Sequence, residues 1–150
     1  MRKFEDAEND YQEALSIYKK IISEYGLKKG EDITFTLLNL GYLNRCKCNW
    51  LKAIEYYQES IDVLNEGFEK GLVRDTIVAL QIISRNYVGI GYCQRALKQF
   101  DNALGSFKMA VDVIDEHINE DNKIIFALDY STALNEYAWS LYEKKDFVKA

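Results

Sequence analysis

Apolar residues along this chain recur every three or four positions, which places them on one face of an α-helix. The pattern extends over nearly all of the 150 residues, and the chain has no proline to interrupt it. Short breaks at 26–30, 67–71 and 119–122 divide the pattern. It therefore predicts an all-α protein with helices over residues 3–25, 32–47, 50–66, 72–97, 100–118 and 123–143, and a further helix that begins at residue 147.

The helical pattern also repeats along the chain. Three stretches align without gaps, and each has a small residue in one helix and an alanine twelve residues later in the next. The pairs are Gly41 and Ala53, Gly91 and Ala103, and Ala138 and Ala150. A partial copy opens the chain at Ala7, and successive alanines are 46, 50 and 47 residues apart. A constant spacing inside each unit and a variable spacing between units is typical of stacked helical hairpins.

The residue types at these positions have a packing reason. The small residues allow two helices to approach closely, so we expect tight contacts at Gly41, Gly91, Ala53 and Ala103. An aromatic ring follows each of these alanines by four residues, on the same helical face, where it can fill the remaining gap: Tyr57 and Phe107. Short polar turns are predicted at 47–49, 98–99 and 144–146, and such short links make consecutive helices antiparallel.

This pattern resembles the tetratricopeptide (TPR) family, whose signature runs W-x2-L-G-x2-Y, then A-x3-F, then A. The best-matching copy carries Tyr87, Ile90, Gly91, Ala103, Phe107 and Ala110. The resemblance implies an α-solenoid of stacked antiparallel hairpins in a right-handed superhelix. The repeat of 46 to 50 residues departs from the usual period of about 34. Its length is similar to the extended repeats of bacterial peptide-sensing regulators and kinesin light chains.

The repeats together predict one TPR-like domain over residues 1–150. It contains a partial repeat at 1–30, repeats at 31–71 and 72–122, and a partial repeat at 123–150. Neither end has the pattern of a polar capping unit. We therefore expect a segment of a longer solenoid, the alternative being a short protein with unusual ends. An apolar stripe of Phe4, Tyr11 and Ile17 or Ile21 in the first helix predicts self-association through the ends.

Composition and charge exclude several classes of protein. The formal net charge of −5 argues against binding of nucleic acid, which needs an excess of Lys and Arg. No apolar run approaches the roughly 20 residues of a membrane-spanning helix, and the first residues do not resemble a secretory signal. The three cysteines, Cys46, Cys48 and Cys93, lack the spacing of a disulfide framework. We expect them to be reduced, buried or half-buried thiols in a cytoplasmic protein.

Motifs for catalysis, metals and cofactors are missing from this sequence. The one histidine, His117, lacks the partners of a metalloprotease helix, and Cys46-x-Cys48 is too few ligands for a zinc site. Gly89-x-Gly91 begins like a dinucleotide-binding loop, but Gln94 stands where the third glycine belongs. We therefore expect no enzyme activity, no catalytic residues, no metal and no cofactor.

The repeat also predicts a binding surface on the first helix of each unit. Aromatic residues and arginines recur there at equivalent positions and share one helical face. The candidate binding residues are Tyr42, Arg45, Arg85, Tyr92, Arg95, Asn135, Trp139 and Tyr142. Aromatic residues and arginine dominate binding hot spots, and the arginine fork suits carboxylates. The alternative is that the tyrosines pack between neighbouring helices and the arginines pair with nearby Glu or Asp.

These patterns predict a protein- or peptide-binding scaffold that uses the concave groove of the repeats, with a partner that carries acidic groups. The alternative is a sensory or regulatory segment of a larger regulator that binds a short peptide signal. We expect neither a nucleic acid nor a membrane as the partner.

Overall fold

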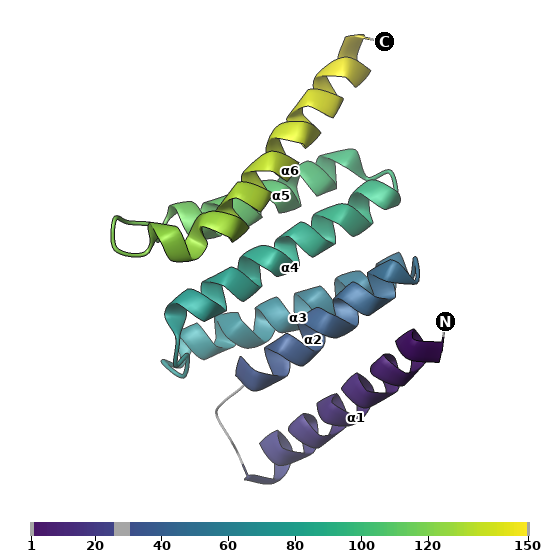
Figure 1. Cartoon of the computed structure of the whole chain (residues 1–150), viewed down its shortest axis with the longest axis vertical. Helices are drawn as coiled ribbons and strands as arrows, with labels where there is room; N and C mark the ends of the chain where they lie inside the picture. Colours follow the sequence, from purple (N-terminus) through teal and green to yellow (C-terminus); the bar gives the residue numbers. More distant parts are fainter. Residues whose placement is uncertain (1, 26–30, 150) are drawn as a thin grey trace.

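The computed structural model of the chain describes residues 2–25 and 31–149, and these residues form helices joined by short loops (Figure 1). The helices are α1 (Arg2–Tyr25), α2 (Glu31–Cys46), α3 (Trp50–Glu69), α4 (Thr76–Ala96), α5 (Phe100–Asp115) and α6 (Lys123–Lys149). The described residues contain no strand. The prediction of an all-α protein is confirmed.

The helices follow one another through the molecule from α1 at one end to α6 at the other (Figure 1). Each helix packs against the next one in the chain, as predicted. The alternate helices α2, α4 and α6 also contact one another in succession. These three helices therefore lie side by side and present one continuous face.

The small residues of the repeat lie where the helices pack most tightly, as predicted. A Cβ atom added at Gly41 of α2 would lie 2.5 Å from the ring of Tyr57 on α3, and one at Gly89 of α4 would lie equally close to the same ring. The ring of Tyr57 is thus held between two glycines on two different helices. Phe107 of α5 packs against Gly91 of α4, where an added Cβ atom would lie 2.6 Å from the Phe107 ring.

Buried polar side chains connect successive helices inside this apolar packing. The Ser60 hydroxyl donates to the backbone carbonyl of Thr34 at 3.2 Å, and the Asn86 amide donates to the Ser60 hydroxyl at 2.8 Å. One unit later, the Ser84 hydroxyl donates to the backbone carbonyl of Ala110 at 2.9 Å. Buried polar groups are costly unless they are hydrogen-bonded, so these bonds favour one register between the helices.

The turns after α2 and α4 are built alike. Cys48 and Lys98 have φ of 60° and 61°, in the left-handed region. The amide of Cys48 donates to the Arg45 carbonyl at 3.0 Å and that of Asn49 to the Asn44 carbonyl at 2.8 Å. This is the Schellman pattern of a helix C-terminus, in which glycine is the usual left-handed residue. The same pair of bonds recurs 50 residues later, around Lys98.

Glycine at these two left-handed positions is expected to stabilise the protein. Cys48→Gly and Lys98→Gly should each raise the free energy of unfolding by about 0.5–1 kcal/mol, because glycine removes the Cβ strain while adding entropy to the unfolded chain. Urea unfolding measures the change. The control is Glu116→Gly, since Glu116 caps α5 with φ of −68°, where glycine relieves no strain. Stabilisation by the control and by neither test variant would contradict the interpretation.

Several predicted boundaries were wrong. The turn predicted at 144–146 does not form, because α6 continues to Lys149. Residues 144–146 contain no glycine or proline, and no residue there adopts a positive φ to end the helix. The helix predicted from residue 72 begins only at Thr76, where the Asp75 carboxylate accepts a bond from the Val78 amide at 3.0 Å and caps it.

The ends of two other helices also differ from the prediction. α3 continues through Gly67 to Glu69, and α5 ends at Asp115 instead of residue 118. The predicted break at 26–30 lies outside the described residues.

Candidate functional site

The candidate residues identified from the sequence lie on α2, α4 and α6, and we call the surface that they form the α2–α4–α6 face. It comprises Phe35, Leu38, Tyr42 and Arg45 of α2, Ile82, Arg85, Tyr92 and Arg95 of α4, and Asp129, Asn135, Glu136, Trp139 and Tyr142 of α6. Tyr42, Trp139 and Tyr142 are each more than half exposed, and Asn135 is also exposed. Such exposed aromatic rings are available to a partner.

Tyrosines and arginines of α2 and α4 form one connected cluster on this face. The Arg45 guanidinium lies between two rings, with its central carbon 5.0 Å from the ring centre of Tyr42 and 5.0 Å from that of Tyr92. The Arg95 guanidinium also lies against two rings. Its central carbon is 5.2 Å from the ring centre of Tyr92 and 5.4 Å from that of Phe107. Cation–π contacts of this length hold the guanidinium groups in place.

Glu136 of α6 joins this cluster to the third helix of the face. It accepts a hydrogen bond from the Tyr92 hydroxyl at 2.8 Å and pairs with Arg95 at 3.0 Å. Burial and the bond to Glu136 raise the pKa of Tyr92 to about 12, because both disfavour the charged phenolate. Arg95 is therefore already paired within the protein.

Arg85 is also paired. It forms two hydrogen bonds with the nearly buried carboxylate of Asp129, at 2.6 and 3.1 Å, and that bond raises the pKa of Arg85. Gln81 donates to the same carboxylate at 2.9 Å. For Arg85 and Arg95, the alternative interpretation from the sequence, pairing with nearby Asp or Glu, is the one that the structure supports.

Arg45 differs from the other two arginines. Among the residues that the structure describes, it forms no ion pair with a carboxylate, and it is only half-buried. Its Nε atom is buried without a hydrogen-bond partner among the same residues, as is one terminal nitrogen of Arg95, so that the difference between the two lies in the carboxylate. Arg45 is therefore the arginine of the face whose charge is not balanced by a neighbouring carboxylate.

Trp139 and Tyr142 form a second, separate aromatic pair. Their ring centres are 5.7 Å apart and tilted by 34°. They lie on α6, one turn apart, and correspond in the repeat to Tyr42 and Arg45 of α2. Of the eight predicted residues, the structure therefore brings four together around Arg45, pairs two on α6, and leaves Arg85 and Asn135 apart from both groups.

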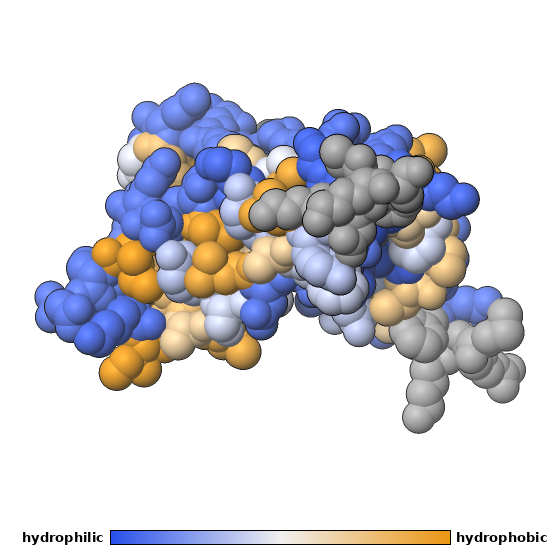
Figure 2. All heavy atoms as spheres, turned by 90° about the horizontal axis from the view of Figure 1, so that it is seen from above, coloured by the Kyte–Doolittle hydropathy of each residue, from blue (hydrophilic) through white to orange (hydrophobic). Residues whose placement is uncertain are grey.

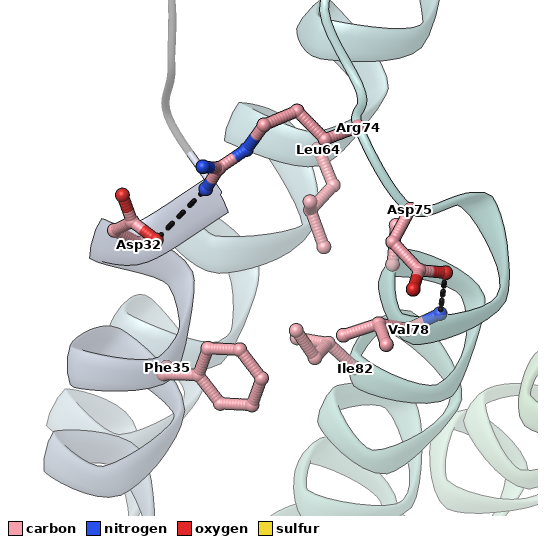
Figure 3. Close-up of a pocket in the computed structure, with 8 residues that line it drawn as sticks. Asp32, Phe35, Leu64, Arg74, Asp75, Val78 and Ile82 are labelled. Atoms are coloured by element: carbon pink, nitrogen blue, oxygen red, sulfur yellow. Dashed lines mark hydrogen bonds and ion pairs between the residues drawn. The ribbon is translucent and has the colours of Figure 1, made fainter.

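A pocket of about 290 Å³ opens between the first turns of α2 and α4 (Figure 3). Apolar side chains of Phe35, Leu64, Val78 and Ile82 line it, and Ala79 completes the wall. Arg74 reaches across its mouth to Asp32, at 2.9 Å. The volume is just below the range for ligand pockets, roughly 300–1,000 Å³, and suits one bulky side chain better than a whole small molecule.

The repeat suggests why the space between α2 and α4 is not filled. Ala79 of α4 corresponds to Phe126 of α6, both lying twelve residues before the small residue of their helix, Gly91 and Ala138. The ring of Phe126 is fully buried and packs with Leu80 and Ile114. Ala79 offers only a methyl group at the same position, so that the α2–α4 interval lacks the ring that fills the α4–α6 interval.

Sequence reasoning missed the carboxylates and the pocket. Asp129 and Glu136 were not assigned, although Asp129 is a charged residue at the position that corresponds to apolar Ile82. That mismatch is a signal that could have been read. The ion pair of Asp32 with Arg74 joins residues 42 positions apart, in α2 and in a loop, and nothing in the repeat pattern pairs them.

The cysteines differ in exposure, which corrects one prediction. Cys46 and Cys48 are exposed instead of buried or half-buried, because they lie at the last residue of α2 and in the exposed turn that follows it. Cys93 is buried, and burial raises its pKa to about 11. All three are free thiols. Over the described part of the chain, no group of three or more His, Cys, Asp or Glu side chains could hold a metal ion.

Comparisons with known proteins assign no family to the chain: no protein-family model matches it, and no curated protein matches it significantly. Among the helices described, none is both long and apolar enough to cross a membrane.

Proposed function

We propose that this chain is a TPR-like α-solenoid with extended repeats, and that it binds a peptide or an extended segment of a partner protein along the α2–α4–α6 face. The repeated fit of an aromatic ring against a glycine of the preceding helix supports the solenoid, since Tyr57 meets Gly41 and Phe107 meets Gly91. The contacts among alternate helices support a continuous groove. The right-handed superhelix follows from the resemblance to the TPR family.

The observation that carries the peptide proposal is the position of Arg45. It is held between two tyrosine rings, half-buried, and without a carboxylate partner among the described residues. A guanidinium that is oriented in advance loses little entropy when it binds a carboxylate, and the surrounding rings limit competition from water. Arg45 therefore suits a carboxylate of the ligand.

The pocket supplies the second contact. Ile82 at the pocket and Tyr92 beside Arg45 are ten residues apart on α4, or about 15 Å at 1.5 Å per residue. An extended peptide covers that length in four or five residues at about 3.3–3.6 Å each. We infer a ligand with a bulky apolar side chain and a carboxylate four or five residues away from it.

A peptide array tests this ligand class. The parent hexapeptide has phenylalanine first, aspartate last and alternating glycine and serine between. Two controls replace phenylalanine by alanine or aspartate by asparagine. The protein should prefer the parent peptide to both, by about tenfold if each contact contributes about 1.4 kcal/mol. Binding should weaken with added salt, because the Arg45 contact is partly exposed.

Matched protein variants assign each preference to its residue. Arg45→Ala should abolish the preference for aspartate over asparagine and leave the preference for phenylalanine. Phe35→Ala should do the reverse, since Phe35 is a partly exposed wall of the pocket. Lys108→Ala on α5 removes a charge outside the face and should change neither preference. If Lys108→Ala changes binding as much as Arg45→Ala, or if no peptide is preferred, the assignment of the α2–α4–α6 face is wrong.

A further inference from the structure

The space between α2 and α4 and the space between α4 and α6 are equivalent in the repeat, but different residues close them. Between α4 and α6, Arg85 pairs with Asp129 at 2.6 Å, and the Phe126 ring is fully buried. The residues at the three corresponding positions between α2 and α4 are all apolar, namely Phe35, Ile82 and Ala79. An ion pair and a large ring are thus replaced by apolar side chains and a pocket of about 290 Å³.

The floor of this pocket is buried and apolar. Leu64, Ala79 and Ile82 are each only 1% accessible. Phe35 forms the exposed wall, and its ring faces Val78 and Ile82 across the opening (Figure 3). The inside of the pocket therefore suits an apolar group.

Phe126 indicates which apolar group fills such a space. Its ring packs with Ile114 of α5. Leu64 of α3 corresponds to Ile114 and lines the pocket. A ring placed beside Ala79 would therefore meet the same kind of aliphatic side chain that Phe126 meets between α4 and α6.

The polar groups of the pocket stand at its mouth. Arg74 reaches across to Asp32, and the Asp75 carboxylate accepts a hydrogen bond from the Val78 amide. A hydroxyl at the far end of an inserted ring would pass these groups and reach the apolar floor. Burial of a hydroxyl without a hydrogen bond is costly, so the pocket should discriminate against tyrosine.

We propose that the pocket between α2 and α4 is a binding site for a phenylalanine ring, which takes the place that Phe126 fills between α4 and α6. Ala79 determines this specificity because its methyl group leaves room for the ring. The proposal names the apolar side chain of the peptide ligand, and in that respect it rests on the proposed function.

Toluene tests the pocket without any peptide, because it has the ring and the first carbon of the phenylalanine side chain. Apolar cavities of similar character bind benzene. NMR of the protein with labelled Ile, Leu and Val methyl groups should show nuclear Overhauser effects from toluene to Leu64, Val78 and Ile82 together.

Two further hexapeptides test the choice of side chain. Tyrosine in place of phenylalanine should weaken binding about tenfold, to the level of the alanine peptide, because its hydroxyl meets the apolar floor. Leucine should weaken binding about threefold, since it fills less of the space and makes fewer contacts.

Ala79→Phe should block the pocket with a ring from the protein itself. Toluene binding should be lost, and the remaining peptide binding should favour aspartate over asparagine but no longer favour phenylalanine. Phe35→Ala removes only the exposed wall, so its fold should survive, and it should weaken toluene binding about tenfold if the wall contributes as much as one good contact. Met109→Ala is the matched control, because Met109 of α5 is 45% accessible and Phe35 is 44% accessible. It should bind toluene like the parent.

Apolar side chains also gather on the surface seen from the α6 end of the molecule (Figure 2). Ile124 and Leu128 of α6 are 83% and 74% accessible, and they offer toluene another surface. Toluene contacts confined to α6, or contacts with Leu64 that persist in folded Ala79→Phe, would overturn the proposal. Equal binding of the phenylalanine and tyrosine peptides would also overturn it. Toluene in the pocket of a protein that binds no peptide would support the ring site and contradict only the proposed function.

Discussion

Replacing Phe107 by alanine should lower the free energy of unfolding by about 3–5 kcal/mol, the usual cost of removing a buried aromatic ring. Phe107 has no accessible surface, and it contacts Tyr92 edge-on at a ring-centre distance of 5.7 Å while it fills the space beside Gly91. Removal of the ring leaves a cavity between α4 and α5 and withdraws the support beneath Tyr92 and Arg95. Urea unfolding followed by circular dichroism measures the loss.

Met109→Ala is the matched control for Phe107→Ala. Met109 lies on the same helix, but 45% of its surface is accessible, so that its loss should change stability by no more than about 0.5 kcal/mol. Equal effects of the two substitutions would contradict the interpretation that an interlocked aromatic ring holds α4 and α5 together.

Alanine at Gly89 should destabilise the protein by about 1–3 kcal/mol, although alanine is the better helix former. The added Cβ atom would lie 2.5 Å from the Tyr57 ring, which is itself buried against Gly41 on the other side. The ring therefore cannot retreat without disturbing a second helix contact. Replacement of Tyr57 by leucine should reduce the cost of the alanine, because the clash is with the ring.

Gly105→Ala provides a control of the same chemical kind. Gly105 also lies within a helix, but an added Cβ there meets nothing within 4 Å. It should stabilise the protein by up to about 1 kcal/mol through helix propensity alone. The two Gly→Ala substitutions should thus have opposite signs in thermal or urea unfolding. Stabilisation by both would mean that Gly89 is not a close-packing position.

The sequence predicted those parts of the fold that depend on a repeated local pattern. Gly41, Gly91, Tyr57 and Phe107 recur at fixed spacing, and the contact of each ring with its glycine is the one predicted. Helix ends were predicted less well, because they depend on single residues. The left-handed conformations of Cys48 and Lys98 end two helices without a glycine, and nothing comparable ends α6 at 144–146.

The candidate site was predictable only in part. Repetition placed Tyr42, Arg45, Tyr92 and Arg95 on one face, and the structure brings them together. It could not tell which arginines would be paired, since the carboxylates of Asp129 and Glu136 come from a neighbouring helix more than 40 residues along the chain. The pocket depends on the small side chain of Ala79. An alanine within a helical pattern is common, so the sequence alone did not indicate a pocket there.

NMR titration of the isotope-labelled protein with the phenylalanine–aspartate hexapeptide tests peptide binding on the α2–α4–α6 face most directly. Backbone and side-chain signals of Phe35, Val78 and Ile82 should shift together with those of Tyr42, Arg45 and Tyr92, at one common affinity. The peptide with asparagine in place of aspartate should leave the Arg45 signals nearly unchanged. Shifts confined to the outer helices α3 and α5, or no shifts at millimolar peptide, would contradict a peptide-binding site on this face.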